Sequence, residues 1–157
     1  MADDIKIHNP SEAYYVTNPI VQSGSAASIA RGCPTKIGSS GYVAIMIDGD
    51  GSTGTRFTGI SKSTSTDTAA ADGNVELWLP LPGLIYYAAA KIAANVDTQA
   101  EIDALYGKRV LFDLTSTVWS VDTGASDAST NCVVILGGDY QTSLIYFAYS
   151  VSGTVLE

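Results

Sequence analysis

The stretch RVLFDLTSTVWSVD, residues 109–122, decides the fold class of this chain. Val110, Phe112 and Leu114 recur at every second position, which is the spacing of side chains on one face of a β-strand. A short turn at Thr115-Ser116 leads into residues 117–122, which have the pattern of a second strand. The stretch therefore predicts a β-hairpin, and the flanking sequence can be interpreted outward from it.

The same rhythm of strand and turn continues on both sides of the hairpin. Asp72-Gly73 and Gly137-Gly138-Asp139 are turn signals that separate apolar segments of strand length. Residues 84–93 are ambiguous, because their alanines favour a helix and the preceding Pro-Gly favours a strand; we take them as a strand. Further strands are expected at residues 42–47, 55–60, 75–79, 132–136 and 143–151.

One helix is expected at residues 98–106. Thr98 and Glu101 have the spacing of a capping box, in which each side chain satisfies a backbone N–H of the first turn. Ile102 and Leu105 lie three positions apart on one helix face, and Gly107 is a residue that ends helices. In residues 98–106, the signals for the start of the helix, its buried face and its end all agree.

Residues 1–41 have a different pattern from the rest of the chain. Prolines at positions 10, 19 and 34 interrupt this segment, and proline cannot donate a hydrogen bond to a β-ladder. We therefore expect an irregular N-terminal arm at residues 1–41 with short extended pieces at 13–16 and 20–22. Residues 42–157 are expected to form one all-β (mainly β) domain, a small β-barrel or sandwich that carries the short helix.

Composition limits the classes of partner. Of the 157 residues 46% are hydrophobic and only 15% are charged, and the net charge is −8. Because a phosphate backbone is repelled by such a chain and no apolar run approaches the length of a membrane helix, we expect neither nucleic acid nor a membrane as partner. Cys33 and Cys132 are far apart in sequence, and whether they are two buried thiols or a disulfide stays open.

Few residues in the chain carry catalytic or metal-binding potential. His8 is the single histidine and has no sequence neighbours that suggest a triad or a zinc site. Residues 48–52 (DGDGS) resemble the start of a calcium loop, but residues 53–60 contain no acid, so we interpret them as a turn. We expect a non-enzyme without metal or cofactor. The alternative is a hydrolase built on converging carboxylates, with the candidates Asp113, Asp122, Asp127 and Asp139.

Aromatic and aliphatic side chains are the stronger functional candidates. Protein interfaces are enriched in Tyr and Trp and depleted in charge at their centres, and this chain has nine tyrosines. The candidate interface residues are Tyr14, Tyr15, Ile20, Val21, Trp78 and Trp119. Two alternatives stay open: the arm can wrap its own domain, and the two tryptophans can be core residues or sugar-stacking platforms.

A series of structural motifs between residues 42 and 150 carries a family resemblance. They are Phe57-Thr58-Gly59-Ile60, Asp72-Gly73, residues 75–79, 98–110, 112–114, 118–119 and 121–122, and Gly137-Gly138-Asp139-Tyr140. This series resembles the small auxiliary proteins that decorate the capsids of tailed bacteriophages. The motifs are structural, so no catalytic residue carries over with the resemblance.

The resemblance implies a function, a partner and a location. Such a protein is a structural component of the virion that binds the outside of an icosahedral capsid and stabilises it through protein–protein contacts. Its implied partners are the major capsid protein and further copies of itself, with a trimer as one option. It would be made in the host cytoplasm and reside on the capsid surface. The alternative is a carbohydrate- or receptor-binding β module of a phage spike or fibre.

Overall fold

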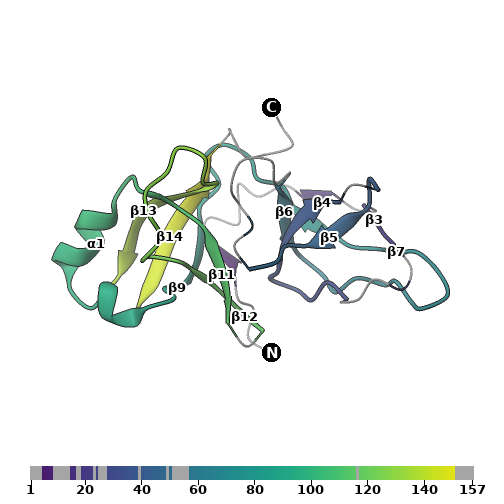
Figure 1. The fold of residues 1–157 in the computed structure, drawn as a ribbon, viewed down its shortest axis with the longest axis horizontal. Helices are drawn as coiled ribbons and strands as arrows, with labels where there is room; N and C mark the ends of the chain where they lie inside the picture. The colour runs from purple at the N-terminus through teal and green to yellow at the C-terminus, as the bar shows by residue number, and fades with distance from the viewer. Residues whose placement is uncertain are drawn as a thin grey trace.

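The computed structural model describes residues 5–8, 15–16, 19–22, 24, 28–38, 40–48, 50, 57–115 and 117–150. Within these ranges the chain forms antiparallel sheets, one α-helix and one short 3-10 helix (Figure 1). The prediction of a mainly β chain with one short helix is confirmed. Neither helix in these ranges has the length and apolar character that crossing a bilayer requires.

Sheet I contains five antiparallel strands in the order β1-β9-β14-β13-β10. They are β1 (Lys6–Ile7), β9 (Tyr86–Ala89), β14 (Leu144–Tyr149), β13 (Val133–Asp139) and β10 (Arg109–Val110). Ile135 and Phe147 face each other in the β13–β14 register, and both are fully buried. The alternation of apolar residues therefore fixes which face of Sheet I turns toward the core.

Sheet II contains five antiparallel strands in the order β2-β8-β6-β4-β5. They are β2 (Tyr15–Val16), β8 (Leu77–Trp78), β6 (Phe57–Ser61), β4 (Pro34–Ile37) and β5 (Val43–Ile45). β4 belongs to the residues expected to form the arm, yet it pairs with β5 on one side and β6 on the other. A smaller sheet pairs β3 (Ile20–Val21) with β7 (Gly73–Asn74).

The predicted hairpin is confirmed as β11 (Phe112–Thr115) and β12 (Val118–Val121), with Phe112 opposite Val121. The single strand expected at residues 109–114 is divided at Leu111. Residues before Leu111 belong to β10 of Sheet I, and residues after it belong to the hairpin. The Leu111 carbonyl accepts a hydrogen bond from the Asp122 amide at 3.0 Å, which holds the division point against the end of β12.

The helix α1 (Gln99–Leu105) begins with the predicted capping box. The Thr98 hydroxyl accepts from the Glu101 amide at 3.3 Å, and the Glu101 carboxylate accepts from the Thr98 amide at 3.1 Å. Ile102 and Leu105 are the buried residues of α1, as their spacing predicts. The ambiguous segment 84–93 contains strand β9, and the 3-10 helix η2 (Ala93–Asn95) follows.

The turn predicted at Gly137-Gly138-Asp139 is wrong. These residues continue strand β13, in which Gly138 pairs with Ile145, and the turn to β14 comes at residues 140–143. The β13–β14 register shifts between Ile135 and Gly137, and Gly137 has φ of 145°. A bulge of this kind uses glycine to keep a strand going through a backbone conformation that other residues avoid.

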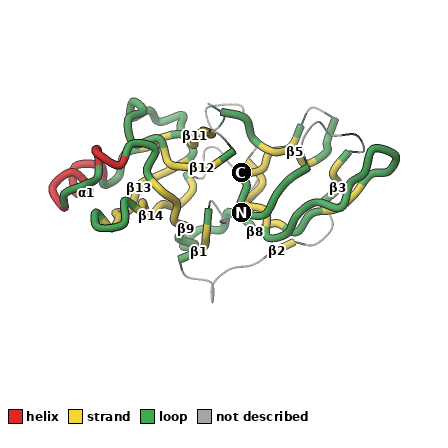
Figure 2. Tube along the Cα trace, turned by 90° about the horizontal axis from the view of Figure 1, so that it is seen from below, coloured by secondary structure: helices red, strands yellow, loops and turns green. Residues whose placement is uncertain are grey.

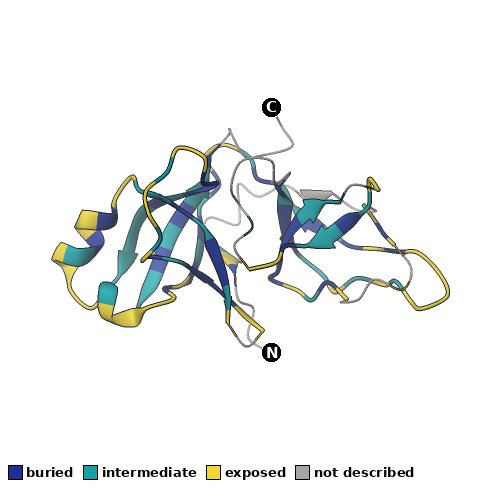
Figure 3. Ribbon diagram, in the orientation of Figure 1, coloured by how far each residue is buried: buried dark blue, intermediate teal, exposed yellow. Residues whose placement is uncertain are grey.

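One hydrophobic core joins the two large sheets and the hairpin. Phe57 of β6 stacks on Tyr149 of β14 with ring centroids 4.0 Å apart, and Phe112 of β11 lies 5.6 Å from Phe147. Figure 1 shows α1 with β9, β13 and β14 at one end and β3 to β7 at the other, with the hairpin between them. Buried residues gather on the strands where these parts meet, and exposed residues gather on α1 and the loops (Figure 3).

Candidate functional site

Three of the six candidate interface residues lie in β3 and β12. Trp119 is 1% exposed and packs edge-on against Phe112 with centroids 6.3 Å apart, so it belongs to the core. Val21 is also fully buried, whereas its neighbour Ile20 is 52% exposed. Of these three residues, only Ile20 therefore offers its side chain to a partner in this conformation.

The other three candidates lie at or near strand β2. Tyr14 falls outside the described residues. Tyr15 pairs with Trp78 in the register of β2 and β8, so the chain brings these two positions together. Trp78 is half-buried and lines a pocket, and it is the candidate that the structure connects to a concave surface.

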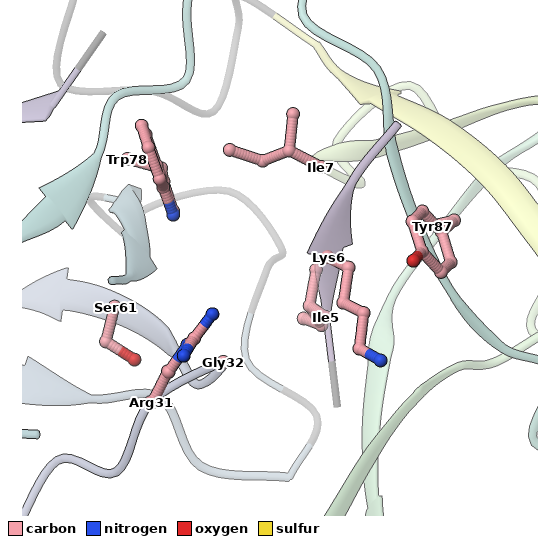
Figure 4. Close-up of a pocket in the computed structure, with 8 residues that line it drawn as sticks. All are labelled: Ile5, Lys6, Ile7, Arg31, Gly32, Ser61, Trp78 and Tyr87. Atoms are coloured by element: carbon pink, nitrogen blue, oxygen red, sulfur yellow. The ribbon is translucent and has the colours of Figure 1, made fainter. Parts of the chain in front are cut away.

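The pocket that contains Trp78 lies between Sheet I and Sheet II and has a volume of about 230 Å³. Figure 4 shows the Arg31 guanidinium and the indole nitrogen of Trp78 turned toward the same space, with Ile7 pointing toward Trp78 from the other side. Its lining residues come from five separate parts of the chain. They are Ile5, Lys6, Ile7, Arg31, Gly32, Ser61, Trp78 and Tyr87.

Strand register explains how β1 presents its side chains. Lys6 lies opposite Tyr87 and Ile7 lies opposite Tyr86. Because side chains alternate between the faces of a sheet, Lys6 and Tyr87 share the outer face, while Ile7 shares the inner face with the fully buried Tyr86. The wall formed by β1 and β9 therefore carries Lys6 and Tyr87 on one face and the apolar Ile7 with Tyr86 on the other.

Backbone hydrogen bonds fix the opposite wall of the pocket. The Gly32 amide donates to the Ser61 carbonyl at 2.9 Å, and the Ser61 amide donates to the Cys33 carbonyl at 2.9 Å. The Ser61 hydroxyl also accepts from the Cys33 amide at 2.9 Å. These bonds tie the turn that carries Arg31 to the end of β6, so Arg31 is presented from a fixed backbone.

A second pocket continues from the first along the outer face of Sheet I. It has a volume of about 410 Å³, and it shares Ile7 and Tyr87 with the first pocket. Its other lining residues are His8, Leu144 and Tyr146. The His8 and Tyr146 rings lie 4.7 Å apart and the Tyr87 and Tyr146 rings 6.5 Å apart. We call the two pockets together the β1 groove.

The described charged residues that line the β1 groove are basic, whereas the whole chain is acidic. Lys6 and Arg31 line it, and Lys62, which pairs with Glu76 at 3.1 Å, lies 5.5 Å from the centre of the Trp78 ring. In the part of the chain that the structure describes, no Asp or Glu lines either pocket. Cations beside half-buried aromatic rings suit a ligand that carries negative charge.

Two of the four aspartates considered for acid–base chemistry are brought together. The Lys91 ammonium contacts the Asp113 carboxylate at 2.7 Å and the Asp122 carboxylate at 3.1 Å. Burial alone raises the pKa of Asp113, but hydrogen bonds from Lys91, Thr115 and Ser120 and the Lys91 charge outweigh it and hold that pKa below its usual value. A general acid needs a raised pKa, so this arrangement fits an ion-pair network better than an acid–base pair.

The side chains of the other two aspartates accept hydrogen bonds from backbone amides. Asp127 accepts from the Arg109 amide at 3.0 Å, and Asp139 accepts from the Gln141 amide at 2.9 Å.

Asp50, from the segment that resembles a calcium loop, pairs with Lys36 and accepts from the Ile47 amide. Among the described residues, no group of three or more His, Cys, Asp or Glu side chains is placed to hold a metal ion. Cys33 and Cys132 are buried thiols and form no disulfide with each other.

The residues of the β1 groove were missed in the sequence, apart from Trp78. Lys6, Arg31 and Tyr87 carry no motif, and only the scarcity of basic residues in an acidic chain could have drawn attention to Lys6 and Arg31. Comparison of the chain with protein-family models, with curated proteins and with solved structures finds no match. The chemistry of the groove therefore has to be interpreted from this chain's own residues.

Proposed function

We propose that this chain is a structural protein that binds the outside of an icosahedral phage capsid and stabilises the shell through protein–protein contacts. The proposal starts from the resemblance of the strand and turn motifs to capsid decoration proteins. A mainly β fold with a single aromatic core supports it, because a protein that holds a shell together has to be rigid.

The observation that carries the proposal is the number of large apolar side chains left exposed on a surface of low charge. They come from both ends of the fold and from the hairpin. They are Ile20, Ile47, Ile92, Tyr106, Val118 and Tyr140. Apolar and aromatic contacts of this kind dominate the energetics of protein interfaces, and they favour contact with several neighbouring chains. The proposed neighbours are the major capsid protein and further copies of this chain.

A capsid-binding assay tests the proposal. Purified protein is mixed with undecorated phage capsids, and the capsids are pelleted and imaged by electron microscopy. We expect stoichiometric co-sedimentation, added density outside the shell, and a higher temperature for capsid disruption. Folded protein that leaves no density on the shell would falsify the proposal.

Exposed side chains provide variants that identify the contacts without disturbing the fold. Tyr106→Ser, Val118→Ser and Tyr140→Ser each remove one exposed apolar side chain. At least one of them is expected to weaken capsid binding by about tenfold or more, because a few residues supply most of an interface's binding energy. Gln141→Ala, next to Tyr140 and also exposed, is the matched control and is expected to bind normally.

A second candidate function is glycan binding, and the placement of Trp78 and Tyr87 in one pocket favours it. Aromatic rings stack on sugar rings, while Lys6 and Arg31 suit an acidic sugar. A glycan array with neutral and acidic members tests this candidate. Binding that Trp78→Ala abolishes supports glycan recognition, and an array without signal rejects it.

A further inference from the structure

Strand β1 is an edge strand with backbone groups directed into the β1 groove. It is the first strand in the order of Sheet I, and among the described residues its one strand partner is β9. The His8 amide donates to the Ile85 carbonyl at 2.7 Å, so positions 8 and 6 form the hydrogen-bonded pairs with β9. Since these pairs alternate along an antiparallel ladder, the N–H and C=O of Ile7 are directed away from β9.

The outer edge of β1 faces Sheet II across the first pocket. Ile7 lines both pockets, so the edge lies at the point where the two pockets meet. Figure 2 shows β1 beside β9, on the side of Sheet I that lies toward β8. The backbone of an extended segment placed along this edge would hydrogen-bond to the N–H and C=O of Ile7, and its side chains would enter the pocket on either side.

The groove is also the place where the chain can receive an acidic partner. The chain carries 16 acidic and 8 basic residues, so an acidic protein is repelled by most of its surface. Lys6 and Arg31 line the groove, and the described Asp and Glu residues do not. Complementary charge of this kind selects partners and accelerates their association.

We propose that the β1 groove receives an extended acidic segment of the partner protein, which adds to the outer edge of β1 as a further strand. Lys6 and Arg31 contact its carboxylates, and Trp78, Tyr87 and Tyr146 pack against its side chains. The identity of the partner rests on the proposed capsid-binding function, whereas the groove and its chemistry do not. The outward N–H and C=O of Ile7 favour a peptide over an acidic glycan, because a peptide supplies both complementary groups at strand spacing.

The first test measures binding of a defined probe. The probe is a fluorescent peptide of alternating Glu and Val, with an alternating Lys and Val peptide of the same length as the charge control. We expect a rise in fluorescence anisotropy with the acidic peptide only, and weaker binding as salt increases. Lys6→Glu and Arg31→Glu are each expected to weaken binding by about tenfold or more. Lys108→Glu makes the same charge change outside both pockets and is expected to bind within about twofold of the parent.

The second test separates strand addition from simple charge attraction. Ile7→Pro removes the outward N–H of β1, and edge strands tolerate proline when its missing N–H faces outward. Ile7→Ala removes the same side chain but keeps the N–H. We expect Ile7→Pro to bind the acidic peptide at least about tenfold more weakly than Ile7→Ala does. Circular dichroism checks that both variants are folded, and equal binding by two folded variants would overturn strand addition.

A capsid-binding experiment with the same variants distinguishes this proposal from the proposed function. If the parent chain binds capsids and Arg31→Glu does not, both proposals are supported. If both bind capsids equally, the groove is not the contact and this inference fails while the proposed function stands. If the acidic peptide binds the groove but the chain ignores capsids, the proposed function fails and the groove proposal stands.

Other occupants are outcomes of the same experiments. Oligogalacturonate that binds the parent chain, is lost in Arg31→Glu and has no peptide counterpart would assign the groove to acidic glycans and overturn the inference. Self-association seen by analytical ultracentrifugation and abolished by Arg31→Glu would assign the groove to a second copy of this chain, and that outcome also overturns it.

Discussion

The core holds two buried tyrosine hydroxyls whose surroundings differ. Tyr86 donates a hydrogen bond to the Leu79 carbonyl at 2.9 Å. The Tyr149 ring packs against the Phe57, Phe112 and Phe147 rings, and its buried hydroxyl finds no hydrogen-bond partner among the described residues. Burial raises the pKa of both hydroxyls, so both stay protonated at neutral pH. A buried hydroxyl without a partner is destabilising because it has lost its bonds to water.

Replacing each tyrosine by phenylalanine should therefore change stability in opposite directions. Tyr149→Phe is expected to raise the free energy of unfolding by up to about 1 kcal/mol, because it removes an unsatisfied polar group and keeps the ring. Tyr86→Phe is expected to lower that free energy by about 1 kcal/mol, since it leaves the Leu79 carbonyl without its donor. Urea unfolding of the two variants measures both effects, and a destabilised Tyr149→Phe variant would mean that the hydroxyl is satisfied.

The two thiols should be chemically inert in the folded protein. Burial raises the pKa of Cys132 to about 12, and only the thiolate form reacts with alkylating agents. Cys33 is 5% exposed and so is shielded from reagents in solution. Iodoacetamide at pH 8 is expected to leave both cysteines unmodified in the native protein and to modify both in guanidinium chloride. Mass spectrometry counts the added groups, and rapid native alkylation at either position contradicts its burial.

Gly59 shows how a single strand position can depend on the neighbouring strand. It lies in β6 with φ of 147°, and a Cβ atom there would stand 2.2 Å from the Trp78 carbonyl of β8. Gly59→Ala is therefore expected to destabilise the fold by roughly 3 kcal/mol or more, from strain and from displacement of β8. Gly41→Ala is the control, because Gly41 also has positive φ but has open space around it. Thermal unfolding compares the two, and equal losses would mean that close packing of β6 on β8 is not the cause.

The ion pairs of Lys91 with Asp113 and Asp122 connect the end of β9 to the hairpin, and their contribution to the stability of the fold should depend on pH. The hydrogen bonds that Lys91 donates to Asp113 and Asp122 raise the pKa of Lys91, so its share of the stability is present below the ordinary value of 10.5 and is lost as pH rises through the higher folded value. The lowered pKa of Asp113 gives stability above the ordinary value of 3.8, which is lost as pH falls through the lower folded value. Lys91→Met should therefore lower the melting temperature most between these two limits. A melting-temperature difference that does not shrink when the pH is taken well below 3.8 and well above 10.5 would show that the ion pairs contribute nothing.

At the element scale, the sequence correctly predicted the elements that depend on interactions within a few residues of each other. The hairpin followed from alternation, and α1 followed from the Thr98–Glu101 capping box, because both signals act within a few residues. The turn predicted at Gly137-Gly138-Asp139 failed because glycine serves bulges as well as turns, and pairing with β14 decided between them. The division of residues 109–114 at Leu111 also depends on pairing with two different strands.

At the scale of the whole molecule, the β1 groove could not be predicted from the sequence. Lys6, Arg31, Trp78 and Tyr87 meet only because β1 pairs with β9 while the Arg31 turn is tied to β6. No spacing rule connects these positions, since their separation in sequence is set by the intervening strands. Composition did indicate an acidic, weakly charged chain, and that property is what makes two cations in one groove informative.

Because one core joins both large sheets, the described fold should unfold as a single unit. Phe57 stacks between the sheets on Tyr149, and the Asp48 carboxylate of the Sheet II side accepts from the Leu114 amide of the hairpin at 3.3 Å. Phe57→Ala is expected to lower the free energy of unfolding by about 3 to 5 kcal/mol, as for other large-to-small changes in cores. Ile47→Ala, at an exposed position, is the control and should change it by less than about 0.5 kcal/mol.

The two tryptophans allow each part of the molecule to be followed separately during that unfolding. A Trp119→Phe variant leaves Trp78 to report on Sheet II, and a Trp78→Phe variant leaves Trp119 to report on the hairpin. In a shared core the urea midpoints from the two fluorescence signals should coincide, and Phe57→Ala should shift both by the same amount. Midpoints that separate, or a shift in the Trp78 signal alone, would show that the two ends of the fold are stabilised independently. The stacked rings would then be a contact between two units rather than the centre of one.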